Sequence, residues 1–155
     1  MFGFGKNKKP KNVSDIRDLN DIKMLIKTVG ESRAGEVIRQ NAQRGNLVCQ
    51  IFMSQAGIYL KQSGLGGSTN QDAEMFTKMG AESGDPGSQF NLAKMLMDKL
   101  DSEADSIDEE QFNLIASAKF WHRKAAAQGF RPSIEALKDL NAFPDTWAEM
   151  VNGAE

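Results

Sequence analysis

The chain has 155 residues, of which 40% are hydrophobic and 26% are charged, and its formal net charge is −2. A chain of this length is expected to form one domain or one short repeat array, and it can bury enough surface to fold without a disulfide or a metal. Lys and Arg are spread along the chain, which argues against nucleic acid as the main partner because nucleic acid favours a basic face.

The single cysteine, Cys49, excludes an intrachain disulfide and fits a reducing compartment. No apolar run approaches the roughly 20 residues that span a bilayer. Residues 1–12 contain four lysines, Phe2 and Phe4, but no apolar core typical of a secretory signal. We therefore expect a cytoplasmic protein with residues 1–12 as a flexible basic tail. A weak contact of this tail with anionic lipid or a partner is the alternative, and it would not give stable membrane insertion.

Residues 14–29 form the first predicted helix, with Ser14 as its N-cap and Gly30 as its stop. Its apolar residues recur at spacings of three and four and predict one buried stripe: Ile16, Leu19, Ile22, Leu25, Ile26 and Val29. The chain shows no sustained period-two alternation, so we predict no sheet.

The rest of the chain contains one pattern three times. An Ala is followed by a bulky apolar residue at +3, a second Ala at +8 and a Gly at +11. The copies are Ala34, Val37, Ala42 and Gly45; Ala73, Phe76, Ala81 and Gly84; and Ala118, Trp121, Ala126 and Gly129. The alanines would allow a neighbouring helix to approach closely, the bulky residue would fill the gap, and the Gly would end the helix.

A second helical pattern follows each of these glycines, and Pro86 and Pro132 stand near the starts of two of them. Residues 144–153 predict a last helix with Pro144 in its first turn and Trp147, Met150 and Val151 facing inward. The expected fold is all-α: an α/α superhelical solenoid of antiparallel helix pairs with N- and C-terminal capping helices. Residues 13–155 would be a single helical-repeat domain, with repeat-like segments at about 34–60, 73–100 and 118–141.

Two of these segments resemble the Sel-one-like repeat family, a relative of the tetratricopeptide repeats. The similarity is carried by ASAKFWHRKAAAQG at 116–129 and AESGDPGSQFNLAKML at 81–96. The first copy departs at Gly57, where the family has a bulky residue, and the third departs at Phe130 and Ile134, where it has Asp and Gln. The resemblance implies an adaptor or scaffold of the kind found in bacterial and eukaryotic complexes, and we expect a bacterial one.

No residue pattern predicts catalysis, a cofactor or a metal site, and we expect no enzyme. His122, the only histidine, would lie on the surface beside an inward-facing Trp121, and Cys49 would be a buried structural thiol. GLGG at 64–67 lacks the strand and the GK[ST] ending of a phosphate loop, so it is interpreted as a connector. Asp101, Glu103 and Asp105 imitate a calcium loop, but Ser106 and Phe112 stand where Gly and Glu are required. A solvated acidic loop is the favoured interpretation, and a contact with a basic partner is the alternative.

In proteins that this chain resembles, the first helix of each repeat lines the concave face of the solenoid. Carried over by position, the partner-binding residues would be Ile51, Gln55, Ile58, Tyr59, Phe90, Lys94, Met97 and Asp98, followed by Glu135 and Asp139 in the third repeat. Five of these are large and apolar, which favours a groove for a partner peptide or helix of another protein. The alternatives are an enzymatic or small-ligand pocket, a groove covered by the chain's own N-terminal helix, and a homodimer that buries the groove.

Overall fold

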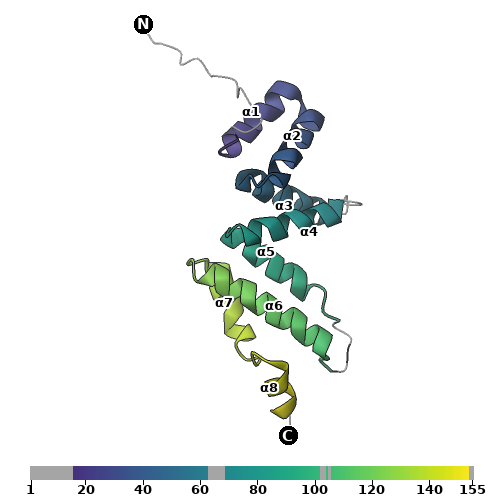
Figure 1. The fold of residues 1–155 in the computed structure, drawn as a ribbon, viewed down its shortest axis with the longest axis vertical. Coiled ribbons are helices and arrows are strands. Elements are labelled where there is room, and N and C mark those ends of the chain that lie inside the picture. The colour runs from purple at the N-terminus through teal and green to yellow at the C-terminus, as the bar shows by residue number, and fades with distance from the viewer. Residues whose placement is uncertain (1–15, 63–68, 102–103, 105, 154–155) are drawn as a thin grey trace. The chain divides into compact units, whose positions relative to one another are not determined.

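A computed structural model describes residues 16–62, 69–101, 104 and 106–153, and no strand occurs among them. The described residues form eight helices (Figure 1), which confirms the all-α class. They are α1 (Leu19–Val29), α2 (Glu31–Gln43), α3 (Leu47–Gln62), α4 (Thr69–Glu82), α5 (Pro86–Met97), α6 (Glu109–Ala126), α7 (Arg131–Leu140) and α8 (Trp147–Asn152). The chain forms two compact units, Met1–Phe76 and Thr77–Glu155, with the boundary inside α4.

The first helix begins later than the sequence indicates. Asp18, not Ser14, is the N-cap of α1, and its side chain accepts hydrogen bonds from the backbone N–H groups of Asn20 and Asp21. Ser14 itself lies outside the described residues. The predicted stop at Gly30 is confirmed, with φ of 82°.

The predicted stripe on this helix is only partly buried. Ile16 and Ile22 are in the core, but Leu19 and Val29 are exposed. Leu19 opens α1 and Val29 closes it, so both exposed residues lie at helix ends.

The three predicted glycine turns are confirmed and share one geometry. Gly45, Gly84 and Gly129 have φ of 95°, 96° and 79°. In each, the glycine N–H donates to the carbonyl of the Ala three residues earlier, at 3.0, 3.1 and 2.9 Å. The next residue's N–H donates to the carbonyl five residues before it, at 3.0, 3.1 and 3.2 Å. This pair of hydrogen bonds defines a Schellman motif, which requires a left-handed residue at the glycine position.

We expect Gly84→Ala to lower the free energy of unfolding by about 1–2 kcal/mol. A Cβ at Gly84 would meet no atom within 4 Å, so the loss would come from the left-handed backbone and not from a clash. Urea unfolding followed by circular dichroism measures this change. Gly84→Asn serves as the control, because Asn tolerates this conformation better and should lose less. Equal losses for both variants would contradict the backbone explanation.

The alanine pattern forms the packing face of α2, α4 and α6. Position +4 is buried in all three copies, whereas the bulky residue predicted at +3 is fully buried only in the second copy. Ala34, Ala42, Ala73, Ala81 and Ala118 are buried, as predicted. The buried +4 residues are Ile38, Thr77 and His122. Of the predicted +3 residues, only Phe76 is fully buried, while Val37 and Trp121 are half-buried. In the third copy Ala125 is buried and Ala126 is half-buried.

Helix geometry explains why position +4 is buried in every copy. Position +8 lies about 80° around the helix from position 0, and position +4 lies between them at about 40°. Position +3 lies about 60° away on the other side, where Phe76 is still covered but Val37 and Trp121 are half-buried.

A buried glutamine joins the two helices in the first two pairs. Gln50 of α3 donates through Nε2 to the carbonyl of Ala42 at 3.0 Å, and Gln89 of α5 donates to the carbonyl of Ala81 at 3.1 Å. The corresponding residue of the third pair is Ile134, which is exposed. Isoleucine in place of glutamine therefore removes the hydrogen bond that joins the two helices in the other pairs, while α6 and α7 still pack against each other.

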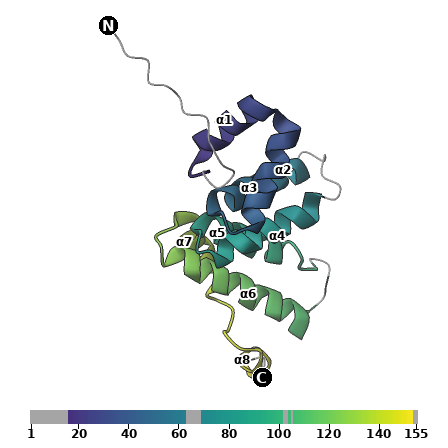
Figure 2. The ribbon, with the colours of Figure 1, turned by 45° about the horizontal axis from the view of Figure 1, so that its top comes forward.

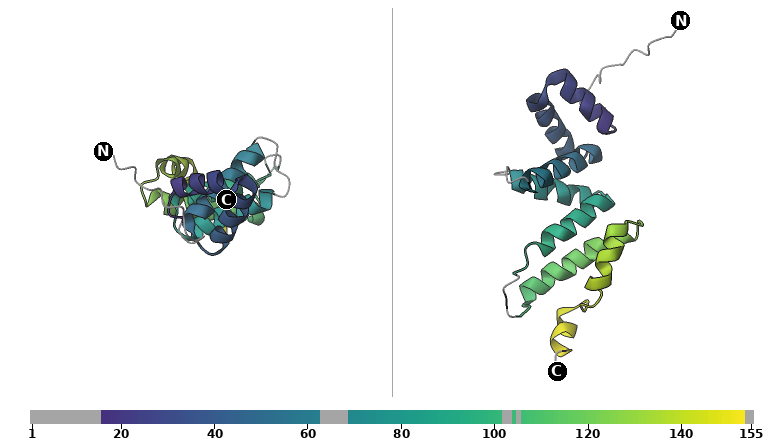
Figure 3. Two further views of the ribbon diagram at one scale, coloured as in Figure 1. Left: turned by 90° about the horizontal axis from the view of Figure 1, so that it is seen from above. Right: turned by 180° about the vertical axis from the view of Figure 1, so that it is seen from behind.

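In the second unit, α7 folds back beside α6, as Figures 2 and 3 show. A short segment then leads to α8, whose N-terminus has a capping box between Thr146 and Glu149. The helix starts at Trp147, so Pro144 precedes it and is not in its first turn. Trp147 and Met150 are half-buried, whereas Val151 is exposed and does not face inward.

Candidate functional site

The predicted binding residues of α3 share one face of that helix, in the first unit. Ile51 and Ile58 are half-buried, Gln55 is exposed, and Tyr59 has 67% of its surface exposed. Residues three, four and seven apart on a helix lie on the same side. The face therefore presents an exposed aromatic ring beside two partly accessible isoleucines.

The predicted binding residues of α5 lie in the second unit and have a different environment. Lys94 and Asp98 are exposed and Met97 is half-buried. The Phe90 ring packs against the His122 ring at 5.5 Å and the Phe130 ring at 5.6 Å. Phe90 therefore contributes to the packing between helices of its own unit. In the third repeat, Glu135 and Asp139 are exposed, and Glu135 pairs with Lys138 at 2.6 Å.

His122 is buried, and its predicted surface position is wrong. Its Nδ1 lies 3.1 Å from the Oγ of Ser133, which is fully buried on α7. A histidine beside a serine is a pairing used in nucleophilic catalysis, but a nucleophile must be reachable by its substrate. Because both side chains are buried, this pair fastens α6 to α7. The sequence signal was available, since His122 is at position +4 of the third copy.

We expect a fall in stability below pH 6.5 that depends on His122. Burial lowers the pKa of His122 from its ordinary value of 6.5. Between 6.5 and the lowered pKa the unfolded chain binds more protons than the folded one, so the free energy of unfolding decreases as the pH falls through this window. Urea unfolding at pH values from 8 to 5 measures the slope.

His122→Gln should flatten this slope, because glutamine does not titrate but can still bond to Ser133. The carboxyl of Asp145, whose pKa is held below 3.8, loses its contribution only at lower pH. A slope unchanged by His122→Gln would show that another group is responsible.

Cys49 is fully buried on α3, as predicted. Burial raises the pKa of its thiol to about 11, so the thiolate needed for reactivity is not formed near neutral pH. The residue occupies the small-residue position that Ser88 and Ser133 occupy in the other two pairs. All three are buried, which supports a packing role.

A cluster of charges around Lys119 is the feature that the sequence did not reveal. Only 5% of the Lys119 side chain is exposed. Its Nζ donates to the carbonyl oxygen of Phe143 at 2.7 Å and lies 2.7 Å from Oδ1 of Asp145. Arg123 donates from Nη2 to both carboxylate oxygens of Asp145, at 3.0 and 3.3 Å. Hydrogen bonds from Lys119 and Arg123 hold the pKa of Asp145 below its ordinary value. Lysine is seldom buried, so nothing in the sequence singles it out.

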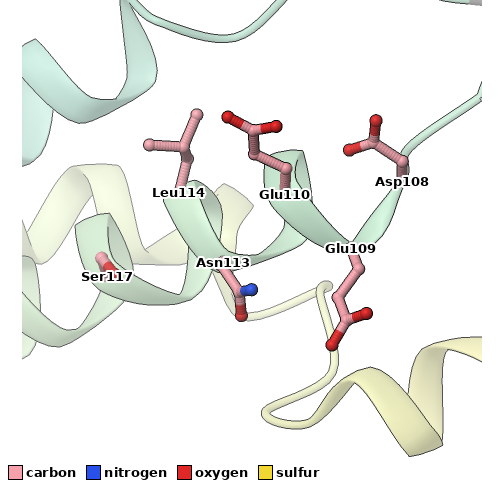
Figure 4. A pocket seen from close by; sticks show the side chains of 6 residues that line it. All are labelled: Asp108, Glu109, Glu110, Asn113, Leu114 and Ser117. Carbon is pink, nitrogen blue, oxygen red and sulfur yellow. The ribbon is translucent and has the colours of Figure 1, made fainter.

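Two hollows lie along α6. One, of about 100 Å³, is lined by Ala116, Lys119, Phe120, Arg123, Pro144 and Asp145. The other, of about 630 Å³, lies at the start of the helix and is lined by Asp108, Glu109, Glu110, Asn113, Leu114 and Ser117. Figure 4 shows that Glu110 and Leu114 extend from one side of α6 while Glu109 and Asn113 extend from the other, so these polar groups do not converge on one point.

Metal-binding clusters are absent from the part of the chain that the structure describes. Glu103, Asp105 and the GLGG segment at 64–67 fall outside that part. None of the described helices has the length and apolarity needed to cross a membrane.

Comparison of the chain with protein-family models, with curated proteins and with solved structures finds no match.

Proposed function

We propose that this protein is a non-catalytic adaptor that binds another protein through a helical-repeat scaffold of the Sel-one-like type. Three Schellman turns with the same hydrogen bonds support the repeats, as do the shared burial of positions 0 and +4 and the glutamine contact in two of the pairs. Stacking of the helix pairs into a superhelical solenoid is part of the proposal. Such pairs bury their apolar faces by stacking.

The observation that carries a binding role is the exposed face of α3. Tyr59 is two-thirds exposed, and it lies on the same face of α3 as Ile51, Gln55 and Ile58. Tyrosine supplies a large contact area at a small entropic cost and is enriched at the centres of protein interfaces. We propose that a partner peptide or helix covers this face.

A photo-cross-linking amino acid tests the proposal directly. Replacing Tyr59 with p-benzoylphenylalanine in the source cells should cross-link a distinct protein on irradiation, whereas the same replacement of the exposed Glu36 on α2 should not. Equal yields from both positions would contradict a specific face. Cross-linking to a second copy of the chain would support the homodimer instead.

We expect Tyr59→Ala to weaken binding of the cross-linked partner by roughly thirtyfold, the usual minimum for a central aromatic contact. Its midpoint of thermal unfolding should change little, because substitutions at exposed positions seldom alter stability by more than about 0.5 kcal/mol. Purified partner and calorimetric titration measure the first effect, and a thermal melt measures the second. A large loss of stability with unchanged affinity would place Tyr59 in the core.

An enzyme or small-ligand protein is the second candidate, and the geometry favours it less. The small hollow beside Lys119 holds about 100 Å³, against the roughly 300–1,000 Å³ typical of ligand pockets. The large hollow is lined by polar groups that extend from opposite sides of a helix (Figure 4).

Light scattering after size-exclusion chromatography separates the monomeric adaptor from the homodimer.

A further inference from the structure

The C-terminal strap, defined as residues 143–152, is fastened to α6 by two kinds of contact. Lys119 and Arg123 hold the carboxylate of Asp145, and Lys119 also binds the carbonyl of Phe143. Two residues after Asp145, the Trp147 ring packs against the Phe112 ring at 5.5 Å. The strap therefore presents a carboxylate and a large aromatic ring, two residues apart, to the helix.

The receiving side chains share one face of α6. Phe112, Ala116, Lys119 and Arg123 are separated by four, three and four residues, which places them along one side of the helix. Two cations on this face meet a single carboxylate, and Lys119 has three N–H donors, of which the strap engages two. This face of α6 therefore offers positive charge for a carboxylate and an apolar surface for an aromatic ring.

Although Lys119 binds it firmly at one end, the strap buries few of its own side chains. Its helix, α8, has six residues and none of them is buried. Asp145 and Arg123 have 57% and 51% of their side chains exposed, and exposed ion pairs add little stability. A helix this short does not persist without its packing contacts. Segments with few buried contacts are the ones that open most easily in folded proteins, and α8 has this character.

We propose that the strap is an intramolecular occupant of a peptide-docking face on α6, and that a partner segment with the same chemistry displaces it. The partner would present an Asp or Glu followed two residues later by Trp or another large aromatic. Only molecules with an open strap can bind that segment. The apparent affinity is therefore the intrinsic affinity multiplied by the fraction of molecules that are open. This inference rests on the proposed role as an interaction module, but it concerns a different surface from the one around Tyr59.

Peptide binding to the full chain tests the proposal. The probe is a fluorescein-labelled peptide, FPDTWAEMVNG, with the sequence of residues 143–153. The double variant Asp145→Asn with Trp147→Ala should open the strap and bind this peptide at least about tenfold more tightly than the unmodified chain. Fluorescence anisotropy measures both affinities. A control peptide with the same two substitutions lacks the carboxylate and the aromatic ring, and it should not bind.

Adding Arg123→Ala to the double variant should remove most of the gain, because it deletes one of the two cations that hold the carboxylate. Lys138→Ala is the matched control: it removes an exposed cation of α7 that pairs with Glu135 and does not contact the strap. Equal affinities for the unmodified chain and the double variant would overturn the proposal. Loss of binding from Lys138→Ala equal to that from Arg123→Ala would overturn it too, since bulk charge would then explain the effect.

Hydrogen exchange on the unmodified chain gives a second test that needs no variant. Backbone amides of residues 146–152 should exchange much faster than those in the middle of α6. Exchange as slow as that of α6 would show that the strap does not open, and would overturn the proposal. Dimerisation of the unmodified chain through exchanged straps would assign the face to a second copy and exclude an outside partner. The Tyr59 cross-linking result is independent of each of these outcomes.

Discussion

Gly57→Leu is expected to lower the free energy of unfolding by roughly 3 kcal/mol, at the upper end of the usual cost of overpacking a core. Gly57 is a buried helical residue of α3 that faces Ala73 of α4. A Cβ at this position would overlap the Cβ of Ala73 and lie 3.0 Å from its Cα. Ala73 cannot move without shifting the backbone of α4. Urea unfolding followed by circular dichroism measures the loss.

Alanine substitutions at two glycines give a sharper form of the same test. Gly57→Ala should destabilise the protein despite the better helix propensity of alanine. Gly35→Ala on α2 should stabilise it by about 1 kcal/mol, because a Cβ at Gly35 would meet nothing within 4 Å. If the two substitutions change the free energy of unfolding in opposite directions, the difference is due to the contact between α3 and α4. The same sign at both positions would show that α3 and α4 do not approach as described.

Phe76→Ala is expected to cost about 3–5 kcal/mol, the usual loss for truncating a fully buried phenylalanine. No part of Phe76 is exposed, and it is the largest of the fully buried side chains. The substitution removes its apolar contacts and leaves a cavity. The free energy of unfolding in urea reports the cost.

Met75→Ala is the matched control for Phe76→Ala. Met75 is the preceding residue on α4 and is exposed, so its truncation should change stability by no more than about 0.5 kcal/mol. Comparable losses from the two variants would mean that α4 is turned so that a different face is buried.

The interpretation of the third repeat from sequence was wrong in one respect, and helix geometry explains the error. Trp121 is a more hydrophobic side chain than His122, so composition favours Trp121 as the inward residue. The backbone places position +4 near the centre of the buried face, and His122 is covered there with Ser133 as its partner. Trp121 remains half-buried at the edge, in contact with the ring of Phe120 at 5.1 Å.

The departure at Gly57 shows a second limit. The sequence shows a glycine where the resemblance predicts a bulky residue, but it does not show which residue comes close. The structure shows that Ala73, on another helix, is the neighbour that requires the absence of a side chain. A contact between residues sixteen apart in the chain depends on how two helices cross, and local sequence carries no record of that crossing.

What the amino-acid sequence determined by itself is the local structure. The recurring alanines and glycines, and the absence of period-two patterning, were enough to predict the helices and the three glycine turns, because these depend on residues close together in the chain. The burial of Cys49 was predicted from its place in the repeat, at a position that favours a small residue. The tertiary structure decided which side of each helix is covered, that Lys119 is buried against Asp145, and that Phe90 packs against two other rings. Those outcomes depend on contacts between separate helices, where the energy of packing outweighs the preference of a single side chain for water or for the core.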